Sequence, residues 1–104
     1  MIYHVCRKED FEKEKDDGLF GSAELGTYGF IHSSTKEGLK KILPRFEKTE
    51  ELVVLYIDED ELKEKIRYED KDQQHLYPHF YEPIDASSIK EIKTLNEWVK
   101  EMDL

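Results

Sequence analysis

The hydrophobic and polar positions of the first and central parts of the chain predict two strands and a helix. Residues 2–6, IYHVC, form a compact apolar run of strand type. The charged segment 8–18, KEDFEKEKDDG, predicts a helix that ends at Gly18. Segment 51–58, ELVVLYID, is a nearly continuous apolar run, which is the pattern of a strand buried on both faces. We therefore expect this segment to be a central strand.

Between these strands the pattern predicts a loop, a strand and a second helix. Segment 19–29, LFGSAELGTYG, is rich in glycine and indicates a loop with a short strand. It leads into a predicted strand over 28–32, YGFIH. Ser34 and Glu37 then have the Ser-x-x-Glu spacing of a capping box. The helix continues with an apolar stripe, and Pro44 interrupts or kinks it. The stripe is formed by Leu39, Ile42, Leu43 and Phe46.

The second half of the chain predicts further strands of different quality. Residues 66–69, IRYE, alternate apolar and polar side chains as a half-buried strand does. The following segment 70–74, DKDQQ, is predicted to be a polar loop. Segment 75–85, HLYPHFYEPID, gathers aromatic and histidine side chains around two prolines. Because proline cannot donate to a strand ladder, we expect an irregular or edge segment here rather than a central strand.

The order of the elements indicates an α+β fold. Residues 87–95 give a last strand, and residues 96–104 a C-terminal helical turn anchored by Trp98. Helices and strands follow one another without the strict βαβ alternation of a parallel sheet, so a mostly antiparallel or mixed sheet flanked by helices is expected. A length of 104 residues predicts a single domain over 1–104.

Charge argues against nucleic acid as a partner. The chain has 25 acidic and 16 basic residues, for a formal net charge of -9, which repels a phosphate backbone. The clearest basic run, residues 36–45, is short and fits a solvated helix face. We expect a small-molecule ligand, no nucleic acid and a monomer or weak dimer.

The sequence also predicts a cytoplasmic protein. Its single cysteine, Cys6, excludes an intrachain disulfide and suits a reducing compartment. The N-terminal segment becomes charged by Arg7, so it lacks the apolar core of a signal peptide. No apolar run approaches the length needed to span a membrane, and we expect no membrane association.

The richest candidate site follows the strand predicted at 28–32. His32 is followed by Ser33, Ser34 and Thr35, so an imidazole, hydroxyl groups and the N-H groups of a helix start meet at one place. That combination suits a phosphate or a carboxylate. The alternative is that the serines merely cap the helix, since a cap needs only one hydroxyl. The residues alone leave both interpretations open.

Four other residues also have two interpretations each. His4 lies on the first strand and is either a ligand-binding group or a structural, hydrogen-bonded histidine. Glu69 ends a predicted strand, where it either faces a cleft or is one surface acid among many. His75 and His79 have the i, i+4 spacing that would pair metal ligands on a helix, but Pro78 breaks such a helix. We expect no metal site.

Together, four segments resemble a known bacterial family. These are IYH at 2–4, GFIHSST at 29–35, LVVLYID at 52–58 and YPHFYEPI at 77–84. In combination they are similar to the domain of unknown function family 952, over a match from Ile2 to about Ile92.

The resemblance implies a fold similar to ADP-ribosyltransferases, whose split sheet clamps nicotinamide adenine dinucleotide (NAD). By position, it implies that His4 holds the adenosine-side ribose and that His32, with Ser33 or Ser34, supports the nicotinamide portion. A glutamate that contacts the nicotinamide ribose is the third expected group. Glu69 is the first choice for it.

His79 and Tyr81 are rivals of Glu69 for the third role. With a carboxylate beside the breaking nicotinamide bond, developing oxocarbenium charge would be stabilised. Two hypotheses follow: an enzyme that transfers or hydrolyses ADP-ribose from NAD, or a non-catalytic module that binds a nucleotide or another anionic ligand on the same fold. We further expect His4, His32 and His79 to share one cleft.

Overall fold

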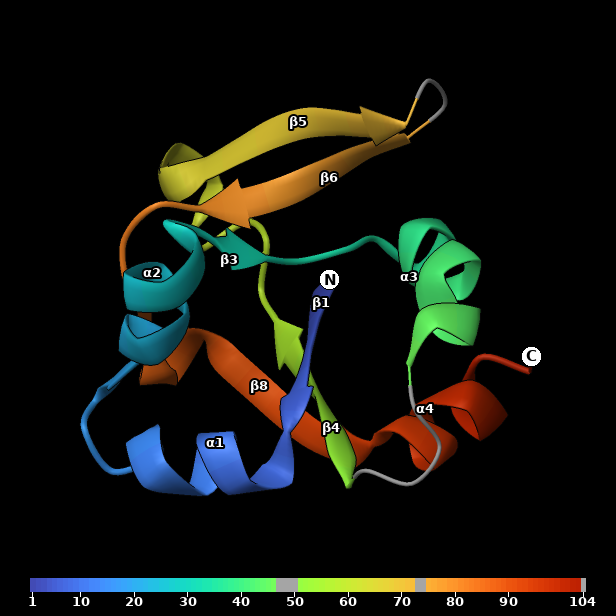
Figure 1. Cartoon of the computed structure of the whole chain (residues 1–104), viewed down its shortest axis with the longest axis horizontal. Coiled ribbons are helices and arrows are strands. Elements are labelled where there is room, and N and C mark those ends of the chain that lie inside the picture. Colours follow the sequence, from blue (N-terminus) through green and yellow to red (C-terminus); the bar gives the residue numbers. More distant parts are fainter. Residues whose placement is uncertain (47–50, 73–74, 104) are drawn as a thin grey trace.

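The strands of the chain form two three-stranded antiparallel sheets, as seen in a computed structural model that describes residues 1–46, 51–72 and 75–103 (Figure 1). The first sheet has the order β1 (Ile2–Arg7), β4 (Leu52–Ile57), β8 (Ile89–Thr94). The second has the order β3 (Ile31–His32), β6 (His75–Phe80), β5 (Ile66–Asp72). A short pair joins β2 (Leu19–Phe20) to β7 (Ile84–Asp85). The expected α+β class with antiparallel sheets is confirmed.

In the described part of the chain, four α-helices lie around the sheets, two on each side of the first sheet (Figure 1). Helices α1 (Lys8–Glu14) and α2 (Ser22–Tyr28) lie on one side, and α3 (Lys36–Ile42) and α4 (Leu95–Glu101) on the other. Three short 3-10 turns complete the chain: Leu43–Arg45, Lys63–Lys65 and Ala86–Ser88.

Strand β4 is the middle strand of the first sheet, as its apolar run predicts. Because side chains alternate along a strand, Val53 and Leu55 enter one hydrophobic cluster and Val54 and Tyr56 enter the other. The first cluster receives Phe11 from α1 and Leu25 from α2. The second is built around Leu39 of α3 and Trp98 of α4. Trp98 has no exposed surface, so the predicted anchor of the C-terminal helix is confirmed.

The glycine-rich segment 19–29 was wrongly predicted as a loop, because residues 22–28 form α2. Glycine lowers intrinsic helix preference, but here it serves at both ends of the helix. Gly21 at the N-cap has φ of 107° and Gly29 at the C-cap has φ of 81°, conformations that favour glycine. The predicted strand at 28–32 is consequently reduced to the two residues of β3.

The start of α3 and the end of α1 also differ from prediction. Thr35, rather than Ser34, is the N-cap of α3, and its hydroxyl accepts a hydrogen bond from Gly38 N at 3.1 Å. Helix α1 ends at Glu14, before the predicted Gly18, which instead takes φ of 76° in the turn that leads to β2. Pro44 does end α3, within the 3-10 turn that follows it.

The most consequential error concerns β6, which is the central strand of its sheet despite two prolines in segment 75–85. Pro78 carries only a carbonyl to share with β3, and this oxygen accepts a hydrogen bond from Ser33 N at 2.9 Å. Since Pro78 cannot donate in return, the β3–β6 ladder stops there. Residues 70–72 of the predicted loop extend β5, and residues 73–74 lie outside the described ranges.

After Ser33 the backbone no longer pairs with β6. The next residue, Ser34, pairs with the first sheet. Ser34 forms a bridge with Tyr3 of β1, in which each backbone N-H donates to the other residue's carbonyl at 2.8 Å. Residues 31–34 are therefore the joint between the two sheets. The backbone of this joint pairs with β6 of the second sheet and with β1 of the first, and this positions the candidate site.

Replacing the N-cap Thr35 by alanine should lower the free energy of unfolding by about 1 kcal/mol, because Gly38 N loses its acceptor. Thr35→Ser keeps the hydroxyl and should retain most of the stability. Urea unfolding of both variants measures the difference. An equal loss in both would show that the threonine methyl group, and not the cap, carries the stability.

Candidate functional site

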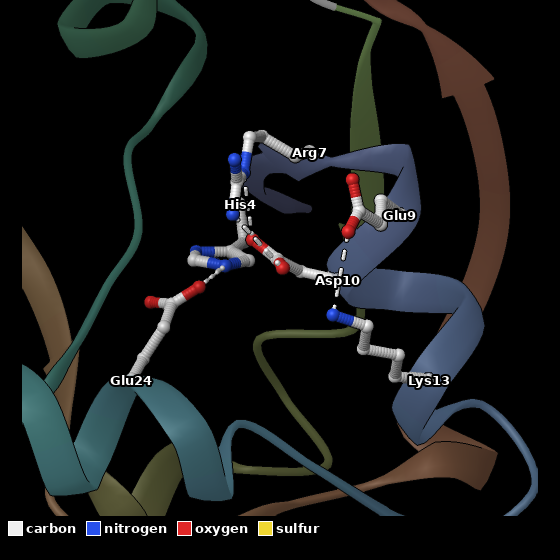
Figure 2. A network of polar contacts seen from close by, with 6 residues as sticks. All are labelled: His4, Arg7, Glu9, Asp10, Lys13 and Glu24. Carbon is white, nitrogen blue, oxygen red and sulfur yellow. Dashed lines mark hydrogen bonds and ion pairs between the residues drawn. The ribbon is translucent and has the colours of Figure 1, made fainter.

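The imidazole of His4 lies at the joint and is almost completely buried, with 2% of its surface exposed. Its Nδ1 is 2.5 Å from the backbone oxygen of His32, and its Nε2 is 2.7 Å from Oε1 of Glu24. Figure 2 shows Glu24 reaching from α2 to the ring of His4. Strand β1 and helix α2 are thus tied to the joint through one side chain.

These contacts require two protons on His4. A backbone carbonyl and a carboxylate can only accept, so Nδ1 and Nε2 both donate and the ring is an imidazolium. Burial by itself lowers the pKa of His4, but the hydrogen bond and charge of Glu24 and the bond to His32 outweigh it. The pKa of His4 is therefore raised, and His4 with Glu24 forms a largely buried ion pair.

A second contact chain leaves the joint from the side chain of His32. Its Nδ1 is 2.9 Å from Nε2 of His79, and its Nε2 is 3.4 Å from Oγ of Ser34. The two histidines face each other across the β3–β6 ladder, where they are register partners. His79 is 1% exposed, whereas His32 is only partly buried. Of these two rings, His32 is the more exposed.

The contact chain continues to the second sheet's edge through Glu69 and Tyr81. Glu69 Oε1 lies 3.4 Å from Nδ1 of His79, and the Tyr81 hydroxyl donates to the same carboxylate. The hydrogen bond from Tyr81 is the largest cause of a lowered pKa of Glu69; desolvation opposes it, and His79 and Arg67 lower the pKa further. The three rivals for the third family role are therefore connected to one another.

Aromatic rings hold the two histidines from the sides. Phe30 stacks on His79 with ring centroids 4.5 Å apart and planes 22° apart. Tyr77 lies 5.3 Å from His32, and Tyr81 lies 6.2 Å from Phe30. These contacts restrict the rotation of both imidazoles, so the distances between their nitrogens are fixed by packing as well as by hydrogen bonds.

The hydroxyl residues after His32 have separate roles. Ser33 and Ser34 are buried, with 0% and 1% of their surface exposed. Thr35 is committed to the helix cap, so its hydroxyl points to Gly38 N. The start of α3 therefore presents a capped terminus, and of the three only Ser34 has a hydroxyl contact with His32.

Sequence reasoning missed Glu24 and Phe30, and it left Tyr77 open between a core residue and the wall of a pocket. Glu24 is one of 25 acidic residues and lies on a helix that was predicted to be a loop. The aromatic residues flank His32 and His79 in sequence, at 30 and 77, and strand alternation could have placed them beside the histidines. Cys6 shares the face of β1 with Ile2, and burial raises its thiol pKa far above the ordinary value, so it is not a reactive thiol.

A depression of the surface lies between α1, β2 and β8, and no histidine lines it. Phe20, which lines it, meets the ring of His4 edge-on at a centroid distance of 5.6 Å. Its other lining residues include Phe11, Glu14, Lys15, Ile89 and Ile92. This depression is mostly apolar, whereas the groups able to exchange protons gather at the joint, so we place the candidate site at the joint.

Within the described ranges, no group of three or more histidine, cysteine, aspartate or glutamate side chains is arranged to hold a metal ion. The expectation of a metal-free protein stays a prediction. Dialysis against a chelator should leave the melting temperature unchanged, because no ligand set would be lost. A fall in melting temperature that added Zn²⁺ reverses would contradict the expectation of a metal-free protein.

In the part of the chain that the structure describes, no helix is long and apolar enough to cross a membrane.

Comparison with known proteins identifies the family. A family described as "Protein of unknown function (DUF952)" matches residues 5–92, most of the chain. The chain belongs to this family. The resemblance drawn from the four sequence segments is thereby confirmed, although the match begins three residues after Ile2. No curated protein matches the chain.

Solved structures similar to this DUF952 chain come from Caulobacter crescentus. The crystal structure of protein CC0527, a structural genomics target, has a TM-score of 0.78 at 26% identity, covering 89% of this chain and 83% of that one. The solution NMR structure of CC0527 has a TM-score of 0.72 at 28% identity, covering 88% and 81%. These similarities support the α+β architecture over most of both chains.

Proposed function

We propose that this DUF952 chain is a small-molecule-binding domain with an ADP-ribosyltransferase-like fold, and that its ligand is NAD or a related nucleotide. The observation that supports this most is the convergence of His4, His32 and His79 at the joint between the two sheets. They come from three segments far apart in the chain. Such convergence of titratable groups is typical of a functional site.

The groups around His32 suit the nicotinamide end of NAD. The nicotinamide ring of the oxidised dinucleotide carries a positive charge, and the exposed ring of Tyr81 offers it an aromatic face. Aromatic faces and carboxylates attract such a cation. The net charge of -9, which disfavours phosphate groups, therefore favours this end of the molecule.

Two versions of the proposal differ in chemistry. In the enzyme, Glu69 and His32 act on the nicotinamide-ribose bond, and ADP-ribose is transferred or hydrolysed. In the non-catalytic module, the same cluster only binds a nucleotide or another anionic ligand. In both versions, His4 must give up Glu24 before its Nε2 can bind a ribose hydroxyl, because both of its nitrogens are engaged inside the protein.

A thermal-shift screen with NAD, ADP-ribose, ADP and nicotinamide tests the proposal. A ligand at 100 times its Kd that binds only the folded chain stabilises it by about 2.7 kcal/mol, so the melting temperature should rise with NAD. His32→Gln should weaken that binding by about tenfold or more, with little change in the unliganded melting temperature. Release of nicotinamide from NAD then distinguishes the enzyme from the module.

Lys40→Gln is a control, since Lys40 is exposed on α3 and has no contact with His32 or His79 in the structure described. It should bind the ligand as the wild type does. If no nucleotide raises the melting temperature, or if both variants bind with unchanged affinity, the joint is not a nucleotide site and the proposal is wrong.

A further inference from the structure

The series of side-chain contacts from Tyr81 to Ser34 allows the protonated nitrogen of each histidine to be assigned. Glu69 is an acceptor, because its carboxylate is ionised and already receives the Tyr81 hydroxyl. Its Oε1 lies 3.4 Å from the buried Nδ1 of His79, too far for a well-formed hydrogen bond, but the negative charge of the carboxylate favours a proton on that nitrogen. In a neutral imidazole the other nitrogen, Nε2, then carries the lone pair.

The proton between the two histidines is assigned in the same way. His32 Nδ1 and His79 Nε2 are 2.9 Å apart, so one of them donates and the other accepts. Since His79 Nε2 carries a lone pair, the donor is His32 Nδ1. This leaves the lone pair of a neutral His32 on its Nε2, the nitrogen that faces Ser34 Oγ at 3.4 Å.

We infer that Glu69 and His79 orient His32 as a general base, with its Nε2 as the basic atom for a water or hydroxyl group of the ligand. This deepens the proposed function and rests on it. His32 is the catalytic residue, because it is the partly exposed member of the pair. The buried His79 and Glu69 behind it are positioning residues that act through His32.

Packing supports a fixed tautomer. The stacked Phe30 ring and the β3–β6 pairing hold His79 in place, and Tyr77 lies against His32. Neither ring can flip without losing these contacts. A ring flip therefore cannot exchange the positions of Nδ1 and Nε2, and the tautomers change only by proton transfer. The 3.4 Å contact of Ser34 with His32 Nε2 is long for a hydrogen bond, so a water or ligand hydroxyl could displace it.

In the hydrolytic version, one step accounts for every atom. The oxygen of water forms a bond to the anomeric carbon of the nicotinamide ribose, and the carbon-nitrogen bond breaks. Its electron pair passes to the nicotinamide nitrogen, which neutralises the positive ring. A proton of the water passes to His32 Nε2. The products are nicotinamide and ADP-ribose, and no oxidant or reductant is needed.

The arrangement assigns Glu69 a different role from the one implied by the family resemblance. There, a glutamate contacts the ribose directly. Here, its carboxylate is engaged by Tyr81 and His79, so Glu69 affects the reaction through the tautomer of His32. Replacing Glu69 should therefore change the reaction rate more than the affinity for the ligand, which is the signature of a group that positions a base.

The test reads the tautomer directly, by ¹⁵N NMR of the histidine side chains at neutral pH without ligand. His32 should show a protonated Nδ1 and an unprotonated Nε2. In Glu69→Gln, the side-chain amide can also donate to His79 Nδ1, so His32 should lose this single tautomer. Glu82→Gln, which alters an exposed glutamate paired with Lys65, should leave the spectrum unchanged.

Two results would overturn the inference: a wild-type His32 protonated at Nε2, or the same His32 tautomer in wild type and Glu69→Gln.

The rate of nicotinamide release from NAD provides the second measurement. Glu69→Gln should lower kcat by about tenfold or more with KM within twofold. If the tautomer is as expected and NAD binds without being cleaved, the hydrolytic step is wrong. If NAD does not bind, the proposed function fails, and the NMR result still decides the tautomer.

Discussion

Replacing Gly21 by alanine is expected to lower the free energy of unfolding by about 3 kcal/mol. Gly21 has φ of 107°, which residues with a β-carbon rarely adopt, and a Cβ there would lie 2.1 Å from Cδ1 of Ile31. Ile31 has no exposed surface and cannot move aside without disturbing the core. Strain in the backbone and overpacking in the core therefore add.

Gly26→Ala is the matched control in the same helix. Gly26 lies inside α2, and a Cβ there meets nothing within 4 Å. Because alanine is a better helix former than glycine, this change should raise the stability by about 0.5 to 1 kcal/mol. Chemical denaturation of both variants measures the two effects. Similar small changes in both would show that Gly21 is not under the constraint described.

The effect of Gly21 extends to the candidate site. Gly21 is the N-cap of α2, which carries Glu24, and it packs on Ile31, the residue before His32. A side chain at 21 would push α2 away from the strand that leads into the joint. The His4–Glu24 ion pair depends on the distance between α2, which carries Glu24, and the joint, where His4 lies. Gly21→Ala should therefore disturb the site as well as the fold.

The strands of the first sheet were predictable because their signal is local. The run in β4 is apolar at almost every position, which indicates burial on both faces in any context. Prediction failed where tertiary contacts decide the conformation. Helix α2 contains a glycine and has glycine at both caps. Strand β6 contains Pro78, which is tolerated because the partner strand β3 ends beside it and needs no hydrogen bond from residue 78.

The site was predictable in its members more than in its connections. His4, His32 and His79 were selected from their segments; His4 contacts the backbone of His32, and the ring of His32 contacts that of His79. That the three share one cleft stays a prediction. Their partners could not be assigned, because a contact such as His4–Glu24 depends on the path of a helix that the pattern did not reveal. The link between Glu69 and His79 likewise depends on β5 and β6 pairing in one register.

The ion pair of His4 and Glu24 should make the stability of the fold depend on pH. The pKa of His4 is raised in the folded state, so its proton contributes stability that is fully present below the unfolded pKa of about 6.5. This contribution is lost as the pH rises through the raised folded value. Glu24→Gln removes the carboxylate, and should cost about 2 kcal/mol at pH 6, where a buried imidazolium loses its charged partner.

The difference between wild type and Glu24→Gln should narrow as the pH rises to about 9, since a neutral His4 can accept a hydrogen bond from the glutamine amide instead. Glu9→Gln is the control, because Glu9 forms an exposed pair with Lys13 on α1 (Figure 2) and should change little at either pH. Denaturation curves from pH 5 to 9 measure both variants. A loss in Glu24→Gln that is constant across this range would mean that His4 is neutral in the folded chain, and that Glu24 stabilises the joint by packing rather than by charge.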